Sequence, residues 1–68
     1  MDNIFGKRLN ELRLERKMSR KELAKNLFVS ERLICYWENG NRECNFDMLI
    51  TLAKFFGVTT DYILGLEY

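Results

Sequence analysis

Apolar residues recur with helical spacing along most of the chain, and no useful stretch alternates in the manner of a β-strand. Within residues 4–16, for example, Phe5, Leu9 and Leu12 stand at positions i, i+4 and i+7 and form one apolar stripe. Residues 46–56 hold more apolar positions than one helical face can take, so we expect that helix to be the most buried. The pattern predicts an all-α fold with helices at about residues 4–16, 20–27, 31–39, 46–56 and 60–64.

Local capping patterns define the second and third predicted helices. Ser19 and Glu22 form an S-x-x-E capping box, in which the serine oxygen and the glutamate carboxylate each accept a backbone N–H. Ser30 stands in the same place before the next apolar segment, so we expect it to cap the third helix. Gly40 is expected to end that helix in a left-handed conformation. The sequence thus predicts two short helices joined by a corner at residues 27–30.

The third predicted helix has two chemically different sides. With successive side chains 100° apart, Ile34 and Trp37 face inward. Arg32, Cys35 and Tyr36 fall on the opposite side, where they would be available to a partner.

Two charged residues are predicted to lie close to the core. Glu38 falls at the edge of the buried sector of the third helix, and Arg13 lies beside the apolar stripe of the first. Arg13 either extends its charged head into water or forms an ion pair with an acid from another helix.

The distribution of charge is more informative than the net charge of +1 for the 68 residues. Residues 1–42 carry a net charge of +4 and residues 43–68 a net charge of −3, an asymmetry that can steer one half of a molecule toward a polyanion. Arg20 and Lys21 occupy the first turn of the second helix, where the helix dipole disfavours cations. A phosphate bound at the N-terminus of this helix would explain the two positive residues. The alternative is that they are ordinary surface charges without a ligand.

The remaining composition argues against catalysis and against a metal or cofactor. There is no histidine, the two serines are both expected caps, and no glycine-rich phosphate loop is present, so we expect no enzyme activity. The two cysteines, Cys35 and Cys44, are too few for a structural zinc site. They are expected to be free thiols in a reducing cytosol, and the alternative is one disulfide between them. We expect no cofactor, no metal and no small-molecule ligand.

No apolar run approaches the roughly 20 residues of a membrane span, and the first eight residues lack the apolar segment of a signal peptide. We therefore expect no membrane association and a cytoplasmic location, in a bacterium or encoded by a phage.

A longer pattern resembles a known family. The order S-R-K-E-L-A-K-N-L-F-V-S-E-R-L-I-C-Y-W-E-N-G, followed by L-A-K-F-F-G-V-T-T-D-Y-I-L-G, is similar to the lambda-repressor/Cro-like (XRE) helix-turn-helix family over about residues 4–65. The resemblance implies a compact five-helix domain in which helices two and three form the helix-turn-helix. It also implies sequence-specific binding of double-stranded operator DNA by a transcription regulator, expected to be a repressor, with residues 31–39 in the major groove.

The resemblance also assigns roles to individual residues. The positions that contact bases are Ser30, Glu31, Arg32 and Tyr36. The positions that contact phosphates are Arg20, Asn39, Asn41 and Arg42, to which the helix-start argument adds Lys21. Arg13 and Glu38 match a partly buried ion pair of the family.

The sequence departs from the family pattern at three positions. Phe28 stands where glycine is usual, at a corner residue that tends to need a positive φ, which should cost on the order of 1 kcal/mol. Arg20 replaces a usual glutamine, and Cys44 replaces a common proline.

A homodimer is expected, because one recognition helix reads only a half-site. Phe55, Leu66 and Tyr68 are the candidate interface residues. The competing hypothesis is a protein-interaction module, such as an antitoxin or adaptor built on the helix-turn-helix fold.

Overall fold

The computed structural model describes residues 3–66, and this range contains five α-helices and no β-strand. The helices are α1 (Ile4–Glu15), α2 (Arg20–Leu27), α3 (Glu31–Asn39), α4 (Phe46–Phe56) and α5 (Thr60–Leu64). The predicted all-α, five-helix class is confirmed. The predicted bounds agree with the structure except that α1 ends one residue earlier, because Arg16 forms its C-cap.

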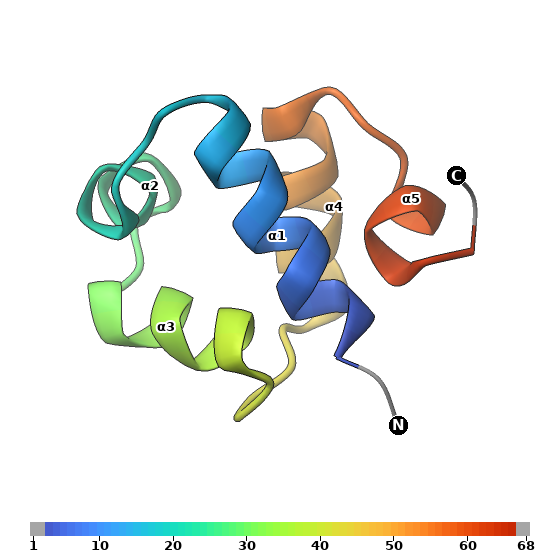
Figure 1. The fold of residues 1–68 in the computed structure, drawn as a ribbon, viewed down its shortest axis with the longest axis horizontal. Helices are drawn as coiled ribbons and strands as arrows, with labels where there is room; N and C mark the ends of the chain where they lie inside the picture. Colours follow the sequence, from blue (N-terminus) through green and yellow to red (C-terminus); the bar gives the residue numbers. More distant parts are fainter. Residues whose placement is uncertain (1–2, 67–68) are drawn as a thin grey trace.

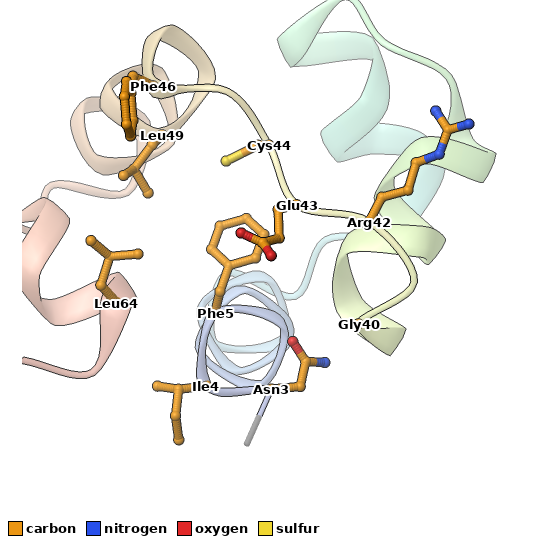
Figure 2. Close-up of a pocket in the computed structure, with 10 residues that line it drawn as sticks. All are labelled: Asn3, Ile4, Phe5, Gly40, Arg42, Glu43, Cys44, Phe46, Leu49 and Leu64. Carbon is orange, nitrogen blue, oxygen red and sulfur yellow. The ribbon is translucent and has the colours of Figure 1, made fainter. Parts of the chain in front are cut away.

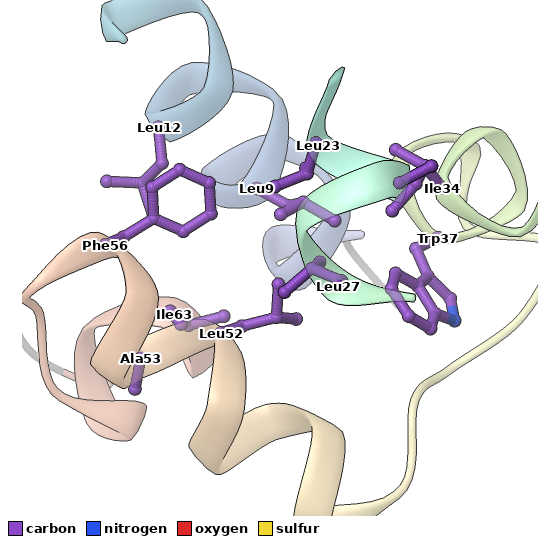
Figure 3. Close-up of a cluster of buried hydrophobic side chains, with 11 residues drawn as sticks. Leu9, Leu12, Leu23, Leu27, Ile34, Trp37, Leu52, Ala53, Phe56 and Ile63 are labelled. Atoms are coloured by element: carbon purple, nitrogen blue, oxygen red, sulfur yellow. The ribbon is translucent and has the colours of Figure 1, made fainter. Parts of the chain in front are cut away.

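The helices pack around one core with α1 at its centre (Figure 1). In this view α2 and α3 lie on one side of α1, and α4 and α5 lie behind it and on the other side. Each helix contributes one side chain with no exposed surface, and these are Leu9, Leu23, Ile34, Leu52 and Ile63. Figure 3 shows these residues converging with Trp37 and Phe56, so the core depends on all five helices.

The helix termini follow the predicted capping pattern. The Ser19 hydroxyl accepts the backbone N–H of Glu22 at 3.0 Å, and the Glu22 carboxylate accepts that of Ser19 at 3.0 Å, which completes the capping box. Ser30 accepts the backbone N–H of Leu33 at 3.1 Å, and Gly40 has the predicted left-handed conformation with φ of 80°. Local sequence therefore fixes the start and end of the two helices of the helix-turn-helix.

Close contact between α1 and the end of α3 depends on Gly6. A Cβ atom added at Gly6 would lie 2.6 Å from the carbonyl oxygens of Trp37 and Glu38. Asn3 joins the same two helices, since its side chain accepts the Gly6 N–H at 3.1 Å and donates to the Glu38 carbonyl at 3.0 Å. Any larger residue at position 6 would force α1 away from α3.

The prediction that the fourth helix is the most buried is wrong. The buried side chains of α4 are Leu52, Ala53 and Phe56, all in its C-terminal half. Phe46 is 84% exposed and Ile50 is 46% exposed, because the other four helices cover only one side of α4. The apolar excess of this helix thus lies on the surface.

The corner between α2 and α3 holds Phe28 in a left-handed conformation, with φ of 58° and ψ of 42°. The predicted conflict at this position is confirmed. The side chain is 94% exposed, so packing within the domain does not offset the backbone strain. Val29 turns back to pack against the core.

We predict that Phe28→Gly stabilises the domain by about 1 kcal/mol, because glycine adopts the left-handed conformation without a Cβ clash. The greater backbone entropy of glycine in the unfolded state offsets part of this stabilisation. The measurement is the free energy of unfolding by urea. Phe28→Ala is the matched control, since it removes the ring but retains the Cβ, and it should leave stability nearly unchanged. Equal stability of the glycine and alanine variants would show that the backbone is not strained.

Candidate nucleic-acid interface

The outward face of α3 is fixed by the residues on its inner side. Ile34 has no exposed surface and Trp37 is 3% exposed, so both are anchored in the core. The opposite side of the helix, with Arg32 and Cys35, consequently faces away from the core, as predicted.

A shallow hollow of about 360 Å³ lies on this outer face. It is lined by Ser30, Arg32, Leu33, Tyr36 and Arg42. The structure thus brings together three of the four predicted base-contacting residues with one predicted phosphate-contacting residue. The fourth, Glu31, is exposed in the first turn of α3 and does not line the hollow.

The loop after α3 is folded back onto the end of the helix. The backbone N–H groups of Asn41 and Arg42 donate to the carbonyl of Tyr36 at 2.8 and 3.4 Å. The guanidinium of Arg42 lies 5.6 Å from the centre of the Tyr36 ring, a cation–π arrangement. Asn39 donates to Cys35 Sγ at 3.3 Å, so its amide is held within α3. Arg42 therefore borders the hollow as a positive group held by its backbone and by the Tyr36 ring.

Beneath this face, Glu38 is the centre of a buried polar network. Its side chain is 1% exposed, and it accepts from Arg13 Nε at 2.7 Å, Arg13 Nη2 at 3.3 Å and Asn10 Nδ2 at 3.2 Å. Arg13 Nη1 also donates to the carbonyl of Met18 at 2.8 Å. The predicted Arg13–Glu38 pair is present, and it joins α1 to α3.

Sequence analysis missed two members of this network, Asn10 and Arg20. Arg20 Nε donates to Glu38 Oε1 at 2.8 Å, which adds α2 to the helices held by the same carboxylate. The Arg20 side chain is 38% exposed, whereas the adjacent Lys21 is exposed and has no place in the network. No sequence spacing pairs residues 20 and 38, because they are brought together only by the packing of α2 on α3.

The electrostatics of Glu38 follow from this environment. Burial alone would raise the pKa of Glu38, but the hydrogen bonds from Arg13, Arg20 and Asn10 outweigh it and hold the pKa below its ordinary value. The carboxylate is therefore ionised at neutral pH, as an ion pair with two arginines requires.

A second concave region lies between the start of α1, the loop after α3, and helices α4 and α5, and Arg42 borders both regions. It is a groove of about 610 Å³ whose apolar lining includes Ile4, Phe5, Phe46, Leu49 and Leu64 (Figure 2). Cys44 also lines it, and burial raises the pKa of this thiol. Both Cys44 and Cys35 are free thiols, as predicted.

The predicted dimer residues occupy different environments. Leu66 is 72% exposed, but Phe55 is half-buried and makes an edge-to-face contact with Phe56 at 5.0 Å between ring centres. Tyr68 lies outside the described residues. Between residues 3 and 66, no helix has the length and apolar character needed to cross a membrane.

Comparison with known proteins agrees with this geometry. A family model described as a helix-turn-helix domain matches residues 6–68, nearly the entire chain. The chain belongs to this helix-turn-helix family. The resemblance to lambda-repressor/Cro-like domains is therefore confirmed, and α2 and α3 are its helix-turn-helix.

The relatives that match are named as transcription regulators. The chain is 36% identical over 63 residues to the HTH-type transcriptional activator BcrR of Enterococcus faecalis, covering 93% of this chain and 31% of BcrR. It is 35% identical over 61 residues to the HTH-type transcriptional regulator ImmR of Bacillus subtilis strain 168, covering 90% of this chain and 48% of ImmR. The HTH-type transcriptional regulator YobD of the same strain is 30% identical over 63 residues, which are 93% of this chain and 56% of YobD. This chain thus spans between 31% and 56% of the length of these relatives.

We predict that Glu38→Gln makes the free energy of unfolding less dependent on pH in the acidic range. Because folding lowers the pKa of Glu38, its ionisation stabilises the fold above the ordinary glutamate pKa of about 4.3, and this stabilisation is lost as the pH falls toward the folded-state value. The variant should be less stable at pH 7 by roughly 3 kcal/mol, and the difference should shrink with acidification.

The measurement is urea unfolding of both proteins between pH 3 and 7. Glu11→Gln, at an exposed position of α1, is the matched control and should retain the wild-type profile. If the free energies of unfolding of wild type and Glu38→Gln differ by the same amount at every pH in this range, folding does not lower the pKa of Glu38.

Proposed function

We propose that this domain binds double-stranded operator DNA in a sequence-specific manner, as part of a transcription regulator, with α3 in the major groove. The observation that carries the proposal is the hollow on the exposed face of α3, where Ser30, Arg32, Tyr36 and Arg42 meet. A helix offering hydrogen-bonding side chains on one side and core anchors on the other fits the major groove. The family and the names of the relatives support the same function.

The proposed base contacts come from the first two turns of α3. Arg32, exposed near the start of the helix, would donate to guanine O6 and N7, a bidentate contact that discriminates by roughly 1–3 kcal/mol. Glu31 would accept from cytosine N4, although it also complements the helix dipole. Ser30 lies at the same end, and Tyr36 would contact a thymine methyl group or a phosphate.

The proposed phosphate contacts flank these positions. Arg20 and Lys21 begin α2, where backbone N–H groups and two positive side chains favour an anion. Asn39 is the last residue of the recognition helix, Asn41 and Arg42 lie in the loop after it, and all three are exposed. Contacts at both ends would fix the register of α3 along the groove.

We further propose a homodimer in the bacterial cytoplasm, because two copies are needed to read two half-sites. The surface best suited to a second copy is the apolar one on the C-terminal helices, where Phe46, Ile50, Leu64 and Leu66 are exposed. Leu66 keeps its proposed role, whereas Phe55 would contribute mainly its half-exposed edge.

The direction of regulation depends on where the operator lies. The expected repression follows if the operator overlaps the promoter, since bound protein then blocks the polymerase. BcrR is named as an activator, so a helix-turn-helix domain of this kind also occurs in a protein that acts in the opposite direction.

One observation favours a second candidate function, that of an antitoxin or adaptor. The groove beside α4 and the 84% exposure of Phe46 provide an apolar surface that a protein partner could cover. An electrophoretic shift on pooled random duplexes, compared with a pull-down from the same extract, separates the two functions.

We predict that Arg32→Ala weakens binding to the cognate operator by about 10- to 100-fold and binding to random duplex by less than threefold, because the lost contact is to a base. Both affinities are measured by fluorescence anisotropy at one salt concentration. Lys54→Ala, on the exposed side of α4, is the control and should change neither affinity. Equal losses on both duplexes would show that Arg32 contacts only the backbone.

We also predict that selection from a random DNA pool enriches an inverted repeat, with half-site centres separated by about one helical turn of roughly 10 base pairs. This result is expected if two copies bind through a two-fold interface. Enrichment of a single half-site without symmetry would argue for a monomer on DNA.

A further inference from the structure

Arg20 links the buried network to the surface of the domain. Arg13, Glu38 and Arg20 form a row of alternating charges whose side chains are 9%, 1% and 38% exposed, respectively. The first two are enclosed by the helices, and only the last reaches solvent. A ligand that binds Arg20 at the surface would therefore be linked, through the Glu38 carboxylate, to the contact between α1 and α3.

The geometry of a guanidinium lets Arg20 make both contacts at once. Its planar group has five N–H donors, and the bond to Glu38 Oε1 at 2.8 Å uses the one on Nε. The terminal nitrogens lie farther along the same plane, so fixing Nε also fixes their direction. Arg20 is the first residue of α2, and this places the group beside the helix N-terminus.

The bond to Glu38 places the guanidinium against the recognition helix, because Glu38 belongs to α3. That hydrogen bond is the main cause of the raised pKa of Arg20, against partial desolvation, and the charges of Glu38 and Glu31 contribute further. Glu31 is exposed in the first turn of α3. Arg20 therefore lies beside the helix that is proposed to meet DNA.

The network also has one positive charge that it does not balance. Among residues 3–66, Arg13 and Arg20 are the cations of the network and Glu38 is its only hydrogen-bonded anion, since Asn10 is neutral. A phosphate placed against Arg20 would continue the alternation of charge and make the network neutral.

We propose that Glu38 holds Arg20 in position as a preformed phosphate clamp, so that a buried carboxylate contributes to DNA affinity without touching DNA. Glu38 is a positioning residue in this arrangement, and Arg20 is the residue that contacts the phosphate. The inference rests on the proposed function. It explains why arginine suits position 20, since a lysine would have to share one nitrogen, on a flexible stem, between the carboxylate and the phosphate.

The test compares Arg20→Lys with Arg20→Gln and with a matched control. Affinity for a 20-base-pair duplex is measured by anisotropy between 50 and 200 mM salt, after circular dichroism has shown each variant to be folded. Arg20→Lys should weaken binding about 5- to 10-fold with an unchanged salt slope, because charge is kept and preorganisation is lost. Arg20→Gln should weaken binding further and reduce the slope by about 0.9, because one phosphate contact is lost.

The control is Arg8→Lys, the same chemical change at an arginine that stacks on Tyr62 at 4.3 Å, on the side of α5. It should leave affinity and salt slope unchanged. If Arg20→Lys binds as tightly as wild type, Arg20 is an ordinary point charge and the inference is wrong, while the proposed function stands. If wild-type protein fails to bind duplex, or binds without salt dependence, the proposed function itself is wrong.

The role of Glu38 is tested separately by Glu38→Gln in two backgrounds. The change should weaken DNA binding about fivefold more when Arg20 is present than when position 20 is glutamine, because only the difference between the two backgrounds reports the positioning of Arg20. Equal effects in both backgrounds would mean that Glu38 acts only through the stability of the domain or the orientation of α3, which overturns the inference. If Glu38→Gln does not fold, the comparison of Arg20→Lys with Arg8→Lys decides.

Discussion

The position of the recognition helix depends on one buried carboxylate. Burying a charge is unfavourable unless it is paired and fully hydrogen-bonded, and Glu38 meets that condition by taking donors from both α1 and α2. Its backbone carbonyl is also used, by the side chain of Asn3. A single residue of α3 thus ties the helix to its two neighbours. Loss of the carboxylate would leave Arg13 buried without its partner, so the network is retained or lost as a unit.

Apolar packing by itself would not specify the angle of α3 so closely. A chain of 68 residues has a small core, and here each helix supplies only one side chain that is completely buried. Hydrophobic contacts of this kind tolerate small rotations of a helix, whereas hydrogen bonds to a fixed carboxylate do not. The absence of a side chain at Gly6 allows α1 to approach α3 closely enough for those bonds to form. Packing provides the stability of the domain, and the polar network sets the orientation of the proposed reading face.

Features set by neighbouring residues could be predicted from the sequence, whereas a contact between distant elements was predicted only where the family resemblance supplied it, as for the Arg13–Glu38 pair. The capping box at Ser19 and the inner position of Trp37 follow from local spacing, and the strain at Phe28 follows from the family resemblance, which implies a glycine at that corner. The structure contains each of them. The Arg20–Glu38 bond depends on how α2 crosses α3, which periodicity does not encode. The exposure of Phe46 was missed for a related reason. An apolar pattern shows which positions favour burial, but it does not show whether another helix is available to cover them.

The division of charge along the chain gives the two halves of the domain different tasks under the proposed function. The positive half, residues 1–42, contains both helices of the helix-turn-helix and every proposed DNA contact. The negative half contains α4 and α5, where exposed Phe46 and Ile50 lie in a setting that a polyanion would avoid. Under the proposed function DNA contacts only residues of the positive half, so the exposed apolar side chains of the negative half are left for a protein partner. A second copy could therefore dock there without competing with DNA, as a dimer that reads two half-sites requires.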